Sequence, residues 1–100
     1  MRARLLLKRK FTDEQGNLWE LVVWSVPFSR LYREGVRYRL AFIPHGMGGP
    51  AVLYDNHHPK GHHKHLEDLE QPYLFSGIDQ LLMDFEKDVS FWKKGRRPRP

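Results

Sequence analysis

The sequence predicts a single α+β domain, built from an antiparallel sheet of about four strands followed by one C-terminal helix. Two observations indicate this fold class. The first half contains short runs that alternate between apolar and charged residues, and the region after residue 76 has apolar residues at helical spacing. A chain of 100 residues fits one domain of ordinary size. We expect residues 1–92 to form this domain and residues 93–100 to form a basic, flexible tail.

The N-terminal part predicts a β-hairpin. Between Arg2 and Phe11, apolar residues alternate loosely with arginine and lysine, which is the period of a strand with one solvated face. Residues 13–17, D-E-Q-G-N, have the composition of a turn. Leu18 to Val26 is rich in aromatic and β-branched residues, and Pro27 ends it. Two such runs joined by a short polar turn predict paired antiparallel strands.

Two further strands are expected. The run from Val36 to Ile43 places Arg37 and Arg39 on one face, and Pro44 stops it. The opposite face carries Val36, Tyr38, Leu40 and Phe42. After a glycine-rich turn, a short fourth strand from Ala51 to Tyr54 leads directly into a histidine-rich segment. A loop that leaves a strand end is held by a rigid scaffold yet open to substrate.

The C-terminal helix has the clearest pattern. Its apolar residues follow helical spacing, at Ile78, Leu81, Leu82, Phe85, Val89 and Trp92. Ser76 lies three residues before Asp79, which predicts a capping box at the helix N-terminus. After Trp92 the sequence is too charged and proline-rich to form regular structure, and its cations are expected to raise affinity for RNA.

Composition narrows the possible functions. The formal net charge is +5, which favours a polyanionic partner such as RNA, DNA or an acidic protein. The chain has no cysteine, so disulfides, thiolate catalysis and cysteine-ligated zinc are excluded. No apolar run approaches the roughly 20 residues of a membrane-spanning helix, and the N-terminus lacks the apolar stretch of a secretory signal. We therefore expect a cytoplasmic protein with no membrane partner.

Residues 55–65 read D-N-H-H-P-K-G-H-H-K-H and contain five of the six histidines. Imidazole can both give and take a proton near neutral pH. RNA supplies its own nucleophile, the 2′-hydroxyl, so an enzyme that cleaves it need only move protons and stabilise charge. One imidazole would accept the 2′ proton, another would protonate the leaving 5′ oxygen, and a lysine would stabilise the phosphorane. The candidate catalytic residues are His57, His58, Lys60, His62, His63 and His65.

Candidate substrate-binding residues flank this segment. Arg37 and Arg39 could hold phosphate, Tyr54 could stack on a base, and Lys64 adds a cation. The two arginines could equally well belong to an ordinary solvated strand face. A tyrosine such as Tyr54 more often lies at the edge of the core than in a base-stacking site.

Three other interpretations of the histidine segment remain open. It could be a solvated polar loop without chemistry. It could bind a metal ion, with an oxygen ligand from Asp55, Glu67 or Asp68, and act as a metal-dependent hydrolase. Against this, Lys60 and Lys64 would repel a dication, so we expect no metal and no cofactor. Finally, the chain could be a non-catalytic module that binds nucleic acid or a protein partner.

Four parts of the sequence resemble the TumE family of toxins. They are the segment Leu53–His65, the later Q-P-Y at residues 71–73, the helix after it and the V-R-Y-R-L strand at residues 36–40. The resemblance covers roughly residues 19–89 and implies a toxin encoded beside an antitoxin that masks it, one with a DNA-binding region. Ribonuclease activity is a separate inference from the residue chemistry, and a RelE-like fold is not implied, because here the strands precede the helix.

Overall fold

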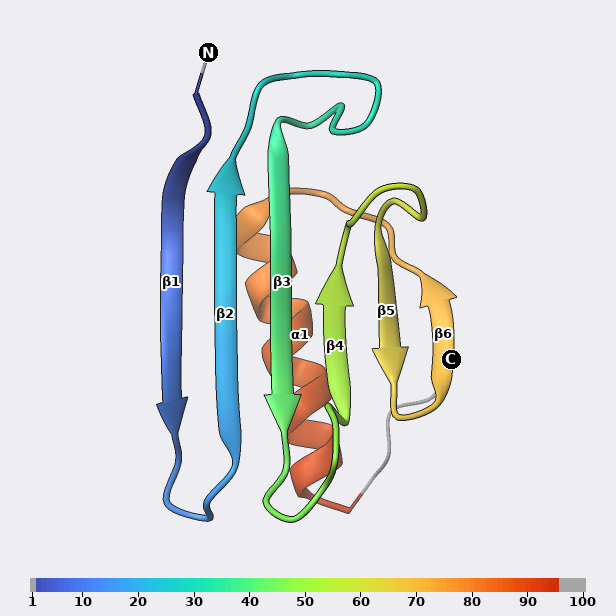
Figure 1. Ribbon diagram of the computed structural model, residues 1–100. Coiled ribbons are helices and arrows are strands. Elements are labelled where there is room, and N and C mark those ends of the chain that lie inside the picture. Colours follow the sequence, from blue (N-terminus) through green and yellow to red (C-terminus); the bar gives the residue numbers. More distant parts are fainter. Residues whose placement is uncertain (1, 96–100) are drawn as a thin grey trace.

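The computed structural model describes residues 2–95 and contains a six-stranded antiparallel sheet with one helix packed on one face (Figure 1). The strands follow chain order across the sheet, so each strand pairs with its sequence neighbour. The predicted α+β class is confirmed, but the sheet has six strands rather than about four. The elements are β1 (Arg4–Thr12), β2 (Leu18–Ser25), β3 (Val36–Ile43), β4 (Val52–Asp55), β5 (His63–Leu66), β6 (Leu69–Pro72) and α1 (Ile78–Lys93).

Strands β5 and β6 come from the segment that the sequence analysis treats as a loop. His63 pairs with Asp55 of β4 on one side and with Pro72 of β6 on the other. Both strands have only four residues and are rich in polar side chains, so their alternation is hard to recognise. Short, polar strands are also a common way to finish the edge of a sheet.

Helix α1 covers the face of the sheet that carries the apolar residues of β3. The Phe85 ring lies edge-on to Trp19 and Tyr54, and Trp92 contacts Phe42 in the same geometry. Leu81, Phe85 and Val89 are the fully buried residues of the helix, as the helical spacing predicts. These contacts fix the helix across the middle of the sheet.

The ends of the helix differ from expectation. Gly77 is the N-cap residue and no side chain caps the helix, so the capping box predicted at Ser76 is wrong. Lys93, expected to begin the tail, is the last residue of α1, and its ammonium lies 3.0 Å from Asp13 Oδ2. Lys94 and Gly95 form a turn after the helix, and the remaining residues of the expected tail, 96–100, lie outside the described residues. Within the described part of the chain, no helix is both long and apolar enough to cross a bilayer.

Among the described residues, no helix packs on the opposite face of the sheet, and we call it the open face (Figure 1). Side chains alternate along each strand, so Arg37 and Arg39 of β3 point to the open face while Tyr38 and Leu40 point to α1. Cross-strand pairing places Trp24 beside Arg37 and Asp55 beside Arg39. The register therefore brings cations, a carboxylate and an indole ring together on one surface.

Candidate functional site

The histidine-rich segment is divided between the two faces of the sheet. His63 and His65 lie two residues apart on β5 and share the open face, while Lys64 between them points toward α1. His57 belongs to the connection between β4 and β5 and also lies on the open-face side, where it lines a cavity with Arg37 and Arg39. These residues make the open face the candidate functional site.

The cavity on the open face has a volume of about 420 Å³. Its lining is mostly apolar and includes Trp24, and its polar groups are the guanidinium groups of Arg37 and Arg39 and the imidazole of His57. Ala3, Val22, Val26 and Tyr38 complete the lining. A cavity of this kind can accept a flat ring against the indole while the arginines hold an attached anion.

Asn56 determines where the chain leaves the sheet before His57. Its side chain is buried and accepts a hydrogen bond from the Tyr38 backbone N–H at 2.9 Å. The same amide donates to the Val36 carbonyl at 2.8 Å. These two bonds replace strand pairing at the end of β4, so the following residue, His57, leaves the sheet at a fixed point beside the cavity.

Asp55 lies between two imidazoles. Its Oδ1 atom is 2.9 Å from His63 Nε2, and its Oδ2 atom is 3.7 Å from His57 Nδ1. His63 is buried, with a side chain only 8 % exposed, whereas the His57 side chain is 41 % exposed. His57 can therefore meet a substrate directly, while His63 is held within the sheet.

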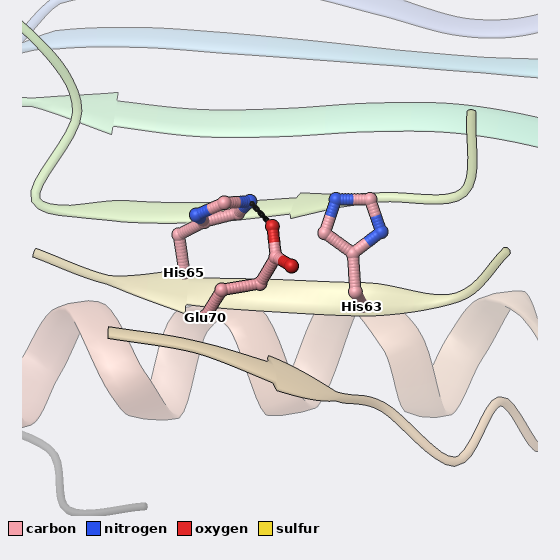
Figure 2. A group of neighbouring side chains, drawn as sticks. All are labelled: His63, His65 and Glu70. Atoms are coloured by element: carbon pink, nitrogen blue, oxygen red, sulfur yellow. Dashed lines mark ion pairs between the residues drawn. The ribbon is translucent and has the colours of Figure 1, made fainter. Parts of the chain in front are cut away.

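A second group of polar and charged side chains lies on β5 and β6, nearer the edge of the sheet (Figure 2). His65 Nε2 lies 3.1 Å from Glu70 Oε1, and Lys60 Nζ lies 2.6 Å from the same oxygen. The hydrogen bond from Lys60 is the main reason that the pKa of Glu70 is below its usual value. Lys60 is thus neutralised by a carboxylate rather than left free for phosphate.

The two arginines differ in their surroundings. Arg39 lies 3.5 Å from Glu20 Oε1, and Lys10 lies 3.7 Å from the other oxygen of the same carboxylate. Arg37 makes no ion pair within residues 2–95 and is exposed at the mouth of the cavity. Its charge is therefore the one most available to an anion.

His62 is not part of the open face. Its Nδ1 lies 2.9 Å from the Tyr38 hydroxyl and its Nε2 lies 2.9 Å from Glu34 Oε1, while its ring stacks on Phe75 with centroids 4.7 Å apart. The bond to His62 is the main cause that lowers the pKa of Glu34, and burial raises that of Tyr38. Both nitrogens of His62 are thus engaged in tertiary contacts beside the core.

Tyr54 and Lys64 also lie on the helix side. Tyr54 is fully buried, and its hydroxyl bonds to Asp88 of α1 in a short hydrogen bond. Lys64 Nζ lies 3.1 Å from the same carboxylate, and Tyr73 donates a hydrogen bond of 2.5 Å to Asp84. Burial, followed by the hydrogen bond to Asp88, raises the pKa of Tyr54. The base-stacking role expected for Tyr54 and the substrate-binding role expected for Lys64 do not fit these positions, because both side chains join the sheet to α1.

The remaining candidate, His58, is exposed at the surface of the connection between β4 and β5 and makes no hydrogen bond within residues 2–95. Sequence reasoning missed Trp24, the link between Asp55 and His63, and Glu70. Trp24 could have been found from the alternation of β2, which places it on the face opposite Val23. The contacts of Asp55 with His63 and of Glu70 with His65 depend on the register of β5, which the sequence did not predict.

Two comparisons gave no match: neither the curated proteins nor the solved structures contain a chain that is significantly similar to this one. A third comparison matched residues 3–93 to a family model described as Toxin TumE. The match includes all six strands and the helix. It suggests that the chain acts with an antitoxin partner. The resemblance noted in the sequence is therefore confirmed, and the chain belongs to the TumE toxin family.

Proposed function

We propose that this toxin cleaves RNA on its open face, by proton transfer through histidine and without a metal ion. The observation that supports the proposal most directly is the 420 Å³ cavity, in which His57 lies with Arg37, Arg39 and Trp24. A nucleotide offers the chemistry that these four groups complement: a base for the indole, a phosphate for the guanidinium groups and a 2′-hydroxyl proton for the imidazole.

His57 is the proposed proton-transfer group next to the bound nucleotide. A neutral imidazole can accept the 2′-hydroxyl proton as the 2′ oxygen attacks the adjacent phosphorus, and the bond from phosphorus to the 5′ oxygen then breaks. The Asp55 carboxylate lies 3.7 Å from His57 Nδ1 and would stabilise the imidazolium that results. Asp55 is thus a positioning residue in this proposal.

His65 is the proposed second proton-transfer group, because it is the other open-face histidine with an accessible ring, 28 % exposed. It would give a proton to the leaving 5′ oxygen. Arg37 and Arg39 would stabilise the negative charge on the phosphorane. His63 is assigned a positioning role, since its nitrogens face Gly61 and Asp55 rather than solvent. His58, Lys60, His62, Lys64 and Tyr54 are left out of the proposed machinery.

The test uses the purified full-length chain and labelled RNA in excess EDTA. We expect products with a 2′,3′-cyclic phosphate and a 5′-hydroxyl, and a loss of at least about 100-fold in rate for His57→Asn. His45→Asn is the matched control, because His45 lies in the turn between β3 and β4, at the other end of the sheet. Binding without cleavage would instead favour a non-catalytic module, and cleavage lost only in EDTA would favour a metal-dependent hydrolase.

A further inference from the structure

His63, His65 and Glu70 form a second constellation on the open face, joined to the cavity at Trp24 by Asp55, which contacts both His63 and the cavity residue His57. The two histidines are two residues apart on β5 and point the same way, and Glu70 lies directly opposite His65 on β6. One ligand atom from each of the three residues lies within 4.8 Å of the others. Figure 2 shows the Glu70 carboxylate between the two imidazole rings.

The hydrogen bonding of His63 fixes the direction of its two ring nitrogens. Its Nδ1 lies 2.8 Å from the Gly61 carbonyl, which can only accept, so Nδ1 must carry a proton. Its Nε2 lies 2.9 Å from Asp55 Oδ1, which as a carboxylate also only accepts. Nε2 is therefore the ring nitrogen that faces the carboxylates, while Nδ1 faces the backbone.

The orientation of His63 is the one that a metal ligand needs. A ligating histidine commonly donates its other ring N–H to a backbone carbonyl or carboxylate, which fixes the tautomer and aims the free nitrogen. Here Gly61 fills that role and leaves Nε2 as the ligand atom. The separation of 3.1 Å between His65 Nε2 and Glu70 Oε1 is close to that of two ligands about 2 Å from a shared tetrahedral ion.

The surrounding charges also suit a dication better than the sequence indicates. Lys64, which was expected to repel a metal ion, points to the other face and pairs with Asp88. Asp55 and Glu70 supply two negative charges beside the histidines. Lys60 remains, with its ammonium on Glu70, but its side chain is 57 % exposed and can move into solvent.

We propose that His63, His65 and Glu70 bind a zinc ion, with the fourth position open to water. Two imidazoles and one carboxylate are a donor set typical of zinc, whereas magnesium and calcium prefer oxygen ligands alone. Zinc at this site removes the proton-transfer capacity of His65. If the ribonuclease proposal also holds, zinc inhibits cleavage and EDTA raises the rate, the opposite of what a metal-dependent hydrolase would show.

The test measures zinc binding directly, using untagged full-length protein and zinc chloride in equilibrium dialysis. We expect one zinc ion per chain, and binding weakened by about 10- to 100-fold in His65→Asn and in Glu70→Gln. His58→Asn is the matched control, because it removes an exposed histidine of the same segment outside the constellation. Circular dichroism confirms that each variant is folded. Wild-type protein that retains no zinc, or His65→Asn and Glu70→Gln that bind as the wild type does, would overturn the proposal.

A substitution at Lys60 is expected to raise the affinity for zinc, whereas the substitutions above lower it. If Glu70 is a ligand, then Lys60→Gln removes a competing cation and zinc binds more tightly. An affinity that does not rise would exclude Glu70 as a ligand. Cobalt substitution gives a further readout, since a tetrahedral site produces the intense visible absorption that an octahedral aquo ion lacks. These binding measurements do not depend on RNA cleavage, so failure of the zinc site and failure of the ribonuclease proposal are distinguishable.

Discussion

The hydroxyl of Tyr38 lies 2.9 Å from Nδ1 of His62, although the neighbouring residue His63 belongs to the opposite face of the sheet. His62 therefore makes structural contacts on the helix side of the sheet, whereas His63 lies within the candidate site on the open face. Substitutions at these two adjacent positions should have different consequences.

His62→Ala is expected to lower the free energy of unfolding by about 1–3 kcal/mol, because it removes bonds to Tyr38 and Glu34 and the stack on Phe75. Urea denaturation followed by tryptophan fluorescence measures this change. His58→Ala, an exposed neighbour, is the control and should have little effect. A His62→Ala protein as stable as the wild type would show that these contacts do not contribute.

The contact between Glu34 and His62 should make stability depend on pH. The pKa of Glu34 is lowered in the folded state, so near and below its ordinary value of 4.5 the unfolded chain binds more protons than the folded one. The stability from this contact is thus present above pH 4.5 and lost as pH falls through the folded pKa. Glu34→Gln should show a shallower loss of stability below pH 4.5 than the wild type, measured by thermal unfolding across pH. Identical slopes would contradict the assignment.

Tyr54→Phe is expected to destabilise the fold by about 1–3 kcal/mol while leaving RNA affinity unchanged, because the hydroxyl bonds to Asp88 beneath the sheet. Denaturation and a fluorescence binding assay separate the two effects. Tyr32→Phe is the control, since the Tyr32 hydroxyl makes no hydrogen bond within residues 2–95. Weaker RNA binding by a stably folded Tyr54→Phe protein would show that the hydroxyl takes part in RNA binding.

Arg37→Gln is expected to reduce by about one the slope of log affinity for RNA against log salt concentration, since it removes one phosphate contact. Arg39→Gln should have a smaller effect, because Glu20 already lies 3.5 Å from that guanidinium. Arg30→Gln, in the connection between β2 and β3, controls for the loss of net charge. Equal slopes for Arg30→Gln and Arg37→Gln would show that only overall charge matters.

The elements with clear periodicity could be predicted from the sequence. Alternation in β3 gave the correct face for Tyr38 and Arg37, and helical spacing gave α1 with its buried Phe85. Strand β5 could not be predicted, because its alternation is between histidine and lysine, and only Leu66 marks a buried side. The face that each of these polar residues occupies is decided by pairing with β4, which sequence alone does not reveal.

Strand pairing also limits how much of the candidate site the sequence can predict. The sequence can single out His57 and the two arginines as candidates, because the chemistry of imidazole and guanidinium groups does not depend on the fold. Trp24 was treated as part of an apolar strand, and Asp55 only as a possible oxygen ligand, because their roles depend on the residues across the sheet. Tyr54 and Lys64 are candidate substrate-binding residues in the sequence but lie on the helix side, and a tyrosine beside a histidine cluster gives no sign of which face it occupies.

Asn56 has a broader consequence for this toxin. Its amide supplies the donor and the acceptor that another strand residue would have supplied to Tyr38 and Val36, so pairing at the end of β4 does not depend on residues 58–60. Those three residues are exposed and can therefore change in sequence at little cost to the rest of the domain. The surface beside the cavity can vary there while the scaffold beneath it stays intact.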